Sequence, residues 1–488
     1  MKNWHEERLL IDGKLVPATG GASYETINPA TEEILGRAAD ASLSDGERAI
    51  QAARRAFDTT EWSRDRALRV RCLRQLHKAM QAHFDDVRDI IVSECGAPVS
   101  LTQGPQLAGP IEVLRWHGEL VDQFEWVEDL GNREAFGRKN HRWIEKEAAG
   151  VVAAITAYNF PIQLALAKLS PALAAGCTVV LKGPPQTPWT TLALGKLIAE
   201  ETDIPPGVVN VLVESGNAVG AALSRHPDID VVSFTGSTPV GRQIMAAASA
   251  TVKRVFLELG GKSAFVLLDD GDINFAAMAC GFAVISHSGQ GCAITSRMVV
   301  PRKRFDDVVA AVRNLLANVK VGDPKDPATM MGPLISAKQR EKVAGYVDRA
   351  VAGGAKAVIG GRIPPQLPRG FFYEPTLIVG ADENSAIAQD ELFGPVLVIL
   401  PHDGDEDAIR IANNSIYGLS GSVMSADRER ALHVARRIRA GTLSVNGGVY
   451  YGPDSPFGGY KQAGIGREMG LAGMAEFLEI KTFAEPAA

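Results

Sequence analysis

The feature that most constrains the fold is an alternation of short apolar strands with helices between Gly150 and Leu257. This alternation predicts βαβ units that build a parallel sheet. The strands are apolar along almost their whole length, so we expect both faces of the sheet to be covered. The predicted strands span 151–156, 177–181, 208–213, 231–234 and 254–257, and the predicted helices span 161–174, 188–200, 217–224 and 238–248.

A second alternation begins at 264–268 and predicts a second α/β domain. Its helices are predicted over 273–286, 304–318 and 337–353, and its strands include 396–400 and 442–445.

The chain before Gly150 predicts short strands over 8–40 and then two helices. We expect Ser44 to cap the first helix, which ends at Phe57, and Ser63 to cap the second, which carries apolar residues as far as Phe84.

Two further segments predict a protruding β arm. Residues 128–147 are polar and charged and lie between the helical part and the first alternation, as a β-hairpin would. Residues 478–483 predict a lone strand near the end of the chain. Both would be available for pairing between subunits.

Charge and composition exclude several classes of function. The net charge of −6 offers no basic excess for nucleic acid. No run of 18 apolar residues predicts a membrane span, and the first residues, MKNWHEERLL, lack the apolar stretch of a signal peptide. The five cysteines are odd in number and show no C-x-x-C spacing, which argues against a disulfide framework or a metal site. We therefore expect a cytoplasmic protein.

A phosphate site is indicated at 231–241, VVSFTGSTPVG, where a buried strand meets a turn and a helix. The free N–H groups of a helix start attract pyrophosphate. The G-x-G-x-x-G pattern is absent, however. An ordinary turn in which Ser237 or Thr238 caps the helix therefore remains an alternative.

Cys292 is the candidate nucleophile, because it lies in the glycine-rich segment SGQGCAITSR. Gly289 and Gly291 would let a substrate approach closely, and open backbone N–H groups there would lower the thiol pKa. The other cysteines are expected to be small buried hydrophobes: Cys72, Cys95, Cys177 and Cys280.

A base and an oxyanion donor are indicated by Glu258 and Asn159. Glu258 interrupts an apolar strand, where burial would raise its pKa towards the range of a general base. A structural ion pair with a Lys or Arg is the alternative. Asn159 follows a strand and precedes Pro161, so its amide could hold a developing negative charge or cap the helix.

Together these segments resemble the aldehyde dehydrogenase superfamily over almost the whole chain. The matching motifs, in order, are YNFP, Lys182, FTGSTPVG, LELGGK, GQGC, ELFGPV and SPFGGYKQAG. The resemblance implies that Cys292 attacks an aldehyde while Asn159 and the Cys292 N–H stabilise the oxyanion. Hydride then passes to a nicotinamide, and Glu258 activates the water that hydrolyses the thioester to the acid.

The resemblance also implies a domain division. A Rossmann-like NAD(P)-binding domain would span 1–127 and 149–260, and a second α/β catalytic domain 261–460. A small β oligomerisation arm would span 128–148 and 473–488. Family members are homodimers or homotetramers built through such an arm, and the sequence does not choose between the two states.

The cofactor implied is NAD, with NADP possible. Where the family usually has Lys-Pro-Ser/Ala-Glu, residues 182–185 read KGPP. The missing glutamate would have bound the 2′-hydroxyl of the adenosine ribose and repelled a 2′-phosphate. Lys182 and Glu391 would hold the riboses, Gly236 and Ser237 the pyrophosphate, and Phe393 the nicotinamide. The full set is Thr156, Lys182, Pro185, Gly236, Ser237, Glu391 and Phe393.

Ala167 and Ser286 stand where the family often has bulky aromatics, so we predict a roomy substrate tunnel for bulky aromatic or aliphatic aldehydes. Gln163 and His287 could add polar contacts, and Glu468 and Asn446 match positions with supporting roles in substrate or proton handling. The tunnel positions are Phe160, Gln163, Leu164, Ala167, Ser286, His287, Tyr450, Tyr451 and Phe457.

Two alternatives stay open. An acylating enzyme would pass the acyl group to coenzyme A, but such enzymes usually lack the base that Glu258 would supply. A non-catalytic member of the same fold would tend to lack Cys292 or Glu258, and both are present.

Overall fold

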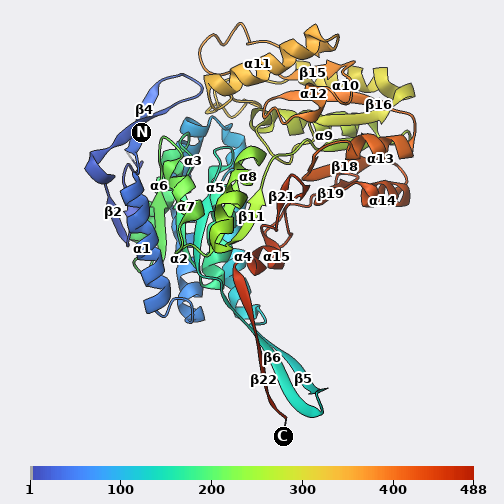
Figure 1. Cartoon of the computed structure of the whole chain (residues 1–488). Coiled ribbons are helices and arrows are strands. Elements are labelled where there is room, and N and C mark those ends of the chain that lie inside the picture. The colour runs from blue at the N-terminus through green and yellow to red at the C-terminus, as the bar shows by residue number, and fades with distance from the viewer. Residues whose placement is uncertain (1–3, 488) are drawn as a thin grey trace.

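The computed structural model describes residues 4–487 and has an α/β architecture with two open sheets and a three-stranded arm (Figure 1). The predicted ranges also include residues 1–3 and 488, which lie outside the described residues, as does the start of the segment inspected for a signal peptide. None of the helices between residues 4 and 487 is long and apolar enough to cross a membrane.

The first sheet has the order β2-β1-β9-β8-β7-β10-β11-β21 and confirms the parallel arrangement predicted from the alternation. Every residue of β7, β8, β9 and β10 is buried, as expected for strands covered on both faces. The parallel strands are β7 (Val151–Ile155), β8 (Thr178–Lys182), β9 (Val209–Leu212), β10 (Val231–Thr235) and β11 (Arg254–Glu258), and the antiparallel edge strands are β1 (Leu9–Ile11), β2 (Lys14–Val16) and β21 (Gly464–Ile465).

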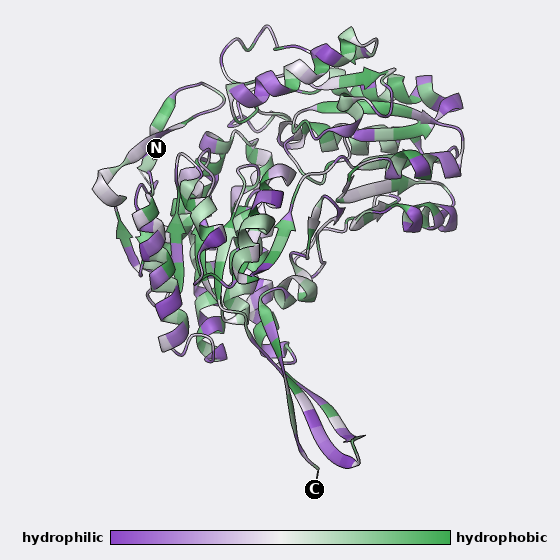
Figure 2. Cartoon of the chain, in the orientation of Figure 1, coloured by the Kyte–Doolittle hydropathy of each residue, from purple (hydrophilic) through white to green (hydrophobic). Residues whose placement is uncertain are grey.

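Helices cover both faces of this sheet, and Figure 2 shows the apolar residues gathered between them. The crossover helices are α5 (Pro161–Ala175), α6 (Pro188–Glu201), α7 (Ala218–Arg225) and α8 (Thr238–Ala248). Helices α5 and α6 contact each other, and α7 contacts α1 and α8 on the other side. The N-terminal helices are α1 (Leu43–Thr59), α2 (Arg66–Ala82), α3 (Phe84–Cys95) and α4 (Ala108–Gln123).

Two predicted helix caps are wrong. Ser42, not Ser44, caps α1, because its side chain and that of Asp45 bond each other's backbone N–H groups in a capping box. Asp65, not Ser63, caps α2 by accepting from the Leu68 N–H. The second predicted helix also ends earlier, since α2 stops at Ala82 and Phe84 opens α3.

The second sheet has the order β14-β15-β16-β13-β12-β18-β19. Alternate residues of its strands enter two cores, so that Met298 and Val300 face α9 and α10 while Val299 faces α11, α13 and α14. The strands are β12 (Ala264–Leu267), β13 (Arg297–Pro301), β14 (Lys356–Ile359), β15 (Thr376–Val379), β16 (Val396–His402), β18 (Ser420–Met424) and β19 (Thr442–Val445). The helices are α9 (Ile273–Ile285), α10 (Phe305–Ala317), α11 (Ala337–Ala352), α13 (Asp405–Asn413) and α14 (Arg428–Arg437).

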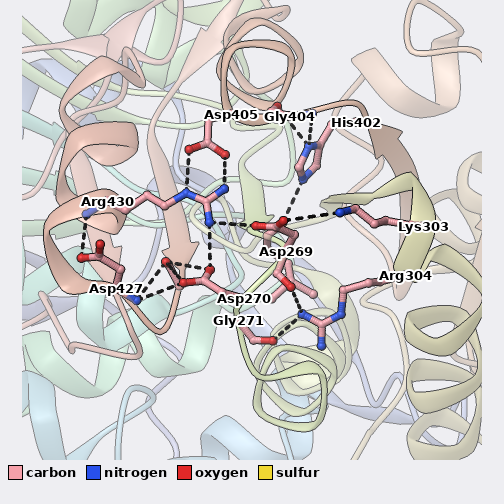
Figure 3. A network of polar contacts seen from close by, with 12 residues as sticks. Asp269, Asp270, Gly271, Lys303, Arg304, His402, Gly404, Asp405, Asp427 and Arg430 are labelled. Carbon is pink, nitrogen blue, oxygen red and sulfur yellow. Dashed lines mark hydrogen bonds and ion pairs between the residues drawn. The ribbon is translucent and has the colours of Figure 1, made fainter.

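A polar network ties α14 to the loop after β12 and to the start of α13 (Figure 3). The Arg430 guanidinium donates to both carboxylate oxygens of Asp405 and to Asp269, and Asp270 lies 3.4 Å away. The charges of this network are paired with one another, which fits a structural role at the edge of the second sheet.

The arm consists of β5 (Val127–Ala135), β6 (Arg138–Ala148) and β22 (Leu478–Pro486), in the order β22-β6-β5. It projects from the body of the molecule (Figure 1). The predicted hairpin and terminal strand are therefore present, but β22 is not a lone strand. It pairs antiparallel with β6 of the same chain from Leu478↔Ala148 to Pro486↔Asn140, so that its backbone groups on that edge are satisfied.

Smaller elements complete the chain. They are β3 (Ser23–Ile27), β4 (Ile34–Ala39), β17 (Tyr417–Gly418), β20 (Tyr460–Lys461), α12 (Ala386–Gln389), α15 (Gly470–Ala475) and short 3₁₀ turns.

Candidate active site

The carboxyl ends of four parallel strands bring several predicted site residues to one edge of the first sheet. Thr156 follows β7, Lys182 ends β8, Gly236 follows β10 and Glu258 ends β11. Chain order reverses between β7 and β10, and ligands of open α/β sheets bind outside the carboxyl ends of the strands at such a reversal.

Four helices begin at this edge, α5, α6, α7 and α8, and their starts differ. Two N–H groups at the start of α6 donate to buried Glu94, at 2.6 and 3.0 Å. Two N–H groups at the start of α7 donate to Glu214, at 2.9 and 3.0 Å.

The start of α8 is different. Its N-cap residue Ser237 makes no side-chain capping bond, and the Thr238 hydroxyl instead donates to the Gln462 carbonyl at 3.1 Å. Ser237 therefore occupies the N-cap position that the alternative gave it, but neither Ser237 nor Thr238 makes a side-chain capping bond. The start of α5 also has no side-chain cap, so α5 and α8 keep backbone N–H groups available, whereas carboxylates accept from those of α6 and α7.

Lys182 is held by Glu214. Its Nζ lies 3.3 Å from Glu214 Oε1, and both side chains are buried. Burial lowers the pKa of Lys182, and the Glu214 carboxylate opposes that shift. Pro185 is half-buried in the loop before α6.

Glu391 and Phe393 lie in the segment between α12 and β16, against the chain that follows β11. Glu391 accepts from the Gly261 N–H at 3.0 Å, and burial raises its pKa to about 7. Phe393 has a φ of 62°, and its ring meets Tyr158 edge-on at 5.9 Å between centroids. The segment that leads into β16 of the second sheet thus supplies part of the predicted cofactor set.

Cys292 lies after α9 in the predicted glycine-rich turn. It is partly exposed, whereas the other four cysteines are buried as expected. The expectation of a lowered thiol pKa is wrong for this structure. Burial raises the pKa of Cys292, Glu258, Glu391 and Glu468 raise it further, and the backbone N–H opposes with a smaller effect.

Asn159 lies between β7 and α5 and does not cap the helix. Phe160 is the N-cap residue and makes no side-chain capping bond. The Asn159 side-chain amide donates to the Gln290 backbone carbonyl at 2.9 Å. The Asn159 backbone carbonyl accepts from the Gln106 side-chain amide at 2.8 Å. The sequence analysis gave neither glutamine a role, although Gln290 lies in the GQGC motif; Gln106 lies in no motif that distinguishes it.

Glu258 is buried, and neither carboxylate oxygen has a hydrogen-bond partner among residues 4–487. The alternative of a structural ion pair therefore does not hold. Burial raises its pKa well above the usual range, the Glu468 charge adds to this, and Lys168 and Arg467 oppose it. The predicted direction of this shift is confirmed.

Glu468 forms a buried ion pair with Lys168, whose Nζ lies 2.5 Å from Glu468 Oε1. Sequence reasoning missed Lys168, although a charged residue in an otherwise apolar helix was a signal that it had a partner.

A cavity of about 460 Å³ opens onto Cys292, Asn159 and Glu468. Most of the predicted tunnel positions line it: Phe160, Gln163, Leu164, Ser286, Tyr450, Tyr451 and Phe457. Residues that the sequence did not single out also line it, among them Phe265, Phe275, Ala279, Ala283, Thr295, Ser422 and Ser444.

Glu258 and three further expected residues lie outside this lining. Ala167 is buried in α5 outside the cavity lining. His287 has a φ of 45°, and its Nε2 lies 3.5 Å from the Cys95 thiol, so its side chain is not part of the lining either. Asn446 accepts from the Ser425 N–H at 3.0 Å and also lies outside the lining.

The chain is 41% identical over 483 residues to a 3-succinoylsemialdehyde-pyridine dehydrogenase of Pseudomonas sp, covering 99% of this chain and 98% of that protein. It is 36% identical to a putative aldehyde dehydrogenase of Staphylococcus epidermidis, covering 99% of both.

Among solved structures, betaine aldehyde dehydrogenase of Staphylococcus aureus in complex with NAD+ matches with a TM-score of 0.95 and 34% identity, over 98% of this chain and 94% of that one. An NAD+ complex of aldehyde dehydrogenase from Bacillus cereus matches with a TM-score of 0.94 and 35% identity, over 99% and 97%. A model of the aldehyde dehydrogenase family matches residues 15–483. The chain belongs to the aldehyde dehydrogenase family.

Proposed function

We propose that the protein oxidises a bulky aromatic or aliphatic aldehyde to the carboxylic acid, with NAD as hydride acceptor. One observation carries the proposal. Cys292 and Asn159 open onto one cavity, and the unpartnered Glu258 carboxylate lies close enough to raise the pKa of the Cys292 thiol.

In this reaction the Cys292 sulfur attacks the aldehyde carbon. The thiol is protonated at rest because its pKa is raised, so a base has to accept its proton as attack begins. Glu258 is suited to this, since burial and the Glu468 charge raise the pKa of its carboxyl well above the usual range and so increase its affinity for a proton.

Asn159 supports the oxyanion. Its amide nitrogen carries two hydrogens, and the Gln290 carbonyl accepts one of them. The other is available for the oxygen that becomes negative on attack, together with the Cys292 N–H. The negative charge on the oxygen of the tetrahedral intermediate is what allows hydride to leave its carbon.

After hydride transfer Glu258 passes the Cys292 proton to solvent and is a carboxylate again. It then acts as base for the water that attacks the thioester on Cys292, and the proton it takes from that water goes to the departing sulfur. The Glu258 carboxylate is free of other hydrogen bonds and is buried at the end of β11. Hydrolysis returns the thiol and releases the acid.

The residues present fit a dinucleotide. Gly236 and Ser237 border the start of α8, which lacks a side-chain cap and would face the diphosphate, although the Gly236 N–H itself donates to the Glu258 carbonyl at 3.0 Å. Lys182 and Glu391 would hold the riboses. Thr156 and Pro185 border the same edge of the sheet, and Phe393 would pack at the nicotinamide end. When bound, the nicotinamide supplies the acceptor carbon for hydride.

The substrate class follows from the cavity lining, which is mostly apolar and aromatic. Glu468 is the one charged residue among the described lining residues, and Lys168 neutralises it. An aldehyde with a remote carboxylate would find no cationic partner there. Ser286 and the small residues Ala279 and Ala283 leave room for a ring or a branched chain. The relative named 3-succinoylsemialdehyde-pyridine dehydrogenase fits this class.

We also propose that the arm serves assembly into a homodimer or homotetramer. The outer edges of β5 and β22 pair with no other strand among the described residues, and such edges recruit further strands. The division into a cofactor domain, a catalytic domain and an arm is part of the same proposal.

The test is a panel of aldehydes with NAD, read as NADH formation with identification of the acid. Formation of free acid without coenzyme A supports the proposal. A requirement for coenzyme A would favour the acylating alternative. No NADH with any aldehyde, from a folded protein, would contradict the proposal.

A further inference from the structure

Glu214 contacts two positively charged groups at the carboxyl edge of the first sheet: the Lys182 ammonium and the N–H groups at the start of α7. It follows β9 and lies between the Lys182 side chain and the start of α7. Glu214 Oε1 is 3.3 Å from Lys182 Nζ and 3.0 Å from the Gly220 N–H, while Oε2 accepts from the Val219 N–H at 2.9 Å. Glu214 is 2% exposed and Lys182 is 6% exposed, so the pair is held in place by packing as well as by charge.

The pairing has an electrostatic consequence. The lysine ammonium and the half-charge at a helix start are the groups that would attract an additional phosphate. One carboxylate already compensates both of them.

The loop around Glu214 adds no positive charge that would attract a phosphate. Residues 213–217 read VESGN and carry no basic side chain. Ser215 donates from its N–H and its hydroxyl to the Asp40 carboxylate, at 2.8 and 2.7 Å, which places a second negative charge beside the same loop.

The two dinucleotides differ at this end of the site. A ribose 2′-hydroxyl is neutral and needs only hydrogen-bond partners. A 2′-phosphate carries a charge of about −1.5 to −2 near neutral pH and needs an uncompensated cation or free N–H groups. Pro185 supplies no charge of either sign, so the sequence motif alone leaves the choice open.

We propose that Glu214 makes this enzyme select NAD over NADP, by neutralising Lys182 and the start of α7, in place of the glutamate that is absent at Pro185. Glu214 is thus a positioning and specificity residue that acts through Lys182. The inference rests on the proposed function, because it takes Lys182 to lie at the adenosine ribose.

The experiment measures the dissociation constants of NAD and NADP directly, by calorimetry, for the wild type and for Glu214→Gln. The amide keeps the size and one acceptor of the carboxylate but removes its charge. We expect the wild type to bind NADP at least about tenfold more weakly than NAD. We expect Glu214→Gln to tighten NADP by about tenfold while NAD changes by less than about threefold.

Glu94→Gln is the matched control. Glu94 also receives two N–H groups of a helix start, that of α6, but it forms no ion pair with Lys182. Its substitution is expected to leave the ratio of the two dissociation constants unchanged. A merely structural role of Glu214 would weaken both dinucleotides alike.

The outcomes separate the two proposals. If the wild type binds neither dinucleotide, the proposed function fails and this inference fails with it. If it binds both equally, or if Glu214→Gln leaves the ratio unchanged, the inference is overturned and the proposed function stands. Should Glu214→Gln not fold, the wild type is titrated with 5′-AMP and with adenosine 2′,5′-bisphosphate. Equal affinity for these two would overturn the inference, and preference for 5′-AMP would support it.

Discussion

The Lys168 ammonium lies 2.5 Å from the Glu468 carboxylate, and this pair is buried beside Glu258. The Glu468 charge raises the pKa of Glu258 and the Lys168 charge lowers it. The base is therefore tuned by a pair of opposite charges contributed by residues 300 positions apart in the chain.

The first prediction concerns the pH dependence of Glu468→Gln. Removing the Glu468 charge lowers the pKa of Glu258, because Lys168 is then uncompensated. The carboxylate form of Glu258 thus persists to lower pH. We expect the acid limb of the kcat profile, measured from about pH 5 to 9, to move to lower pH. An unmoved acid limb, or a shift to higher pH, would show that Glu258 does not control it. Glu94→Gln, which changes a buried carboxyl outside the cavity, is the control.

Thiol reactivity gives a second prediction. The pKa of Cys292 is raised, so alkylation by iodoacetamide should accelerate steadily as the pH rises through neutrality, since only the thiolate reacts. Glu258→Gln removes one of the charges that raise this pKa and should speed alkylation at a given pH. The rates are followed by mass spectrometry of the Cys292 peptide, with buried Cys280 as internal control. A rate independent of pH would contradict the raised pKa.

Gln106 offers a third prediction, because it holds the Asn159 backbone without reaching the substrate. Asn159→Ala should lower kcat/KM by about 10²-fold through loss of an oxyanion donor. Gln106→Leu removes the 2.8 Å bond to the Asn159 carbonyl and should lower kcat by a smaller factor, about tenfold, with KM little changed. If Gln106→Leu matches wild type, Asn159 is positioned by its other contacts alone.

The fourth prediction tests the width of the cavity. Ser286 lines it, so Ser286→Phe should narrow it and shift kcat/KM from benzaldehyde towards acetaldehyde. The ratio of the two kcat/KM values is expected to fall by about tenfold or more. Ala167→Ser, outside the lining, should leave the ratio unchanged. A wild type that clearly prefers acetaldehyde would contradict the proposal of a bulky substrate.

Much of the fold was predictable, because strand and helix periodicity are local properties. Helix α8 has the predicted bounds, and α5 differs by one residue. Helix caps were less predictable, since Ser42, Ser44, Ser63 and Asp65 are all acceptable caps and tertiary packing decided between them.

The site divides in the same way. Cys292, Asn159 and Glu258 lie in local motifs, so the sequence alone could propose them. His287 lies next to Ser286 in sequence, but a φ of 45° turns its side chain towards Cys95 instead of the cavity. The Lys168–Glu468 pair and the role of Gln106 arise from long-range contacts, which a single sequence does not encode in any local pattern.

The candidate site spans two separate hydrophobic cores. Asn159 and Glu258 belong to the body built on the first sheet, whereas Cys292 follows a helix that packs on the second. A rigid rotation of one body against the other would change the distance between the Cys292 thiol and the Asn159 side-chain amide without exposing either core. We therefore expect activity to be lost at a lower urea concentration than the one that unfolds the protein, while both cores are still intact.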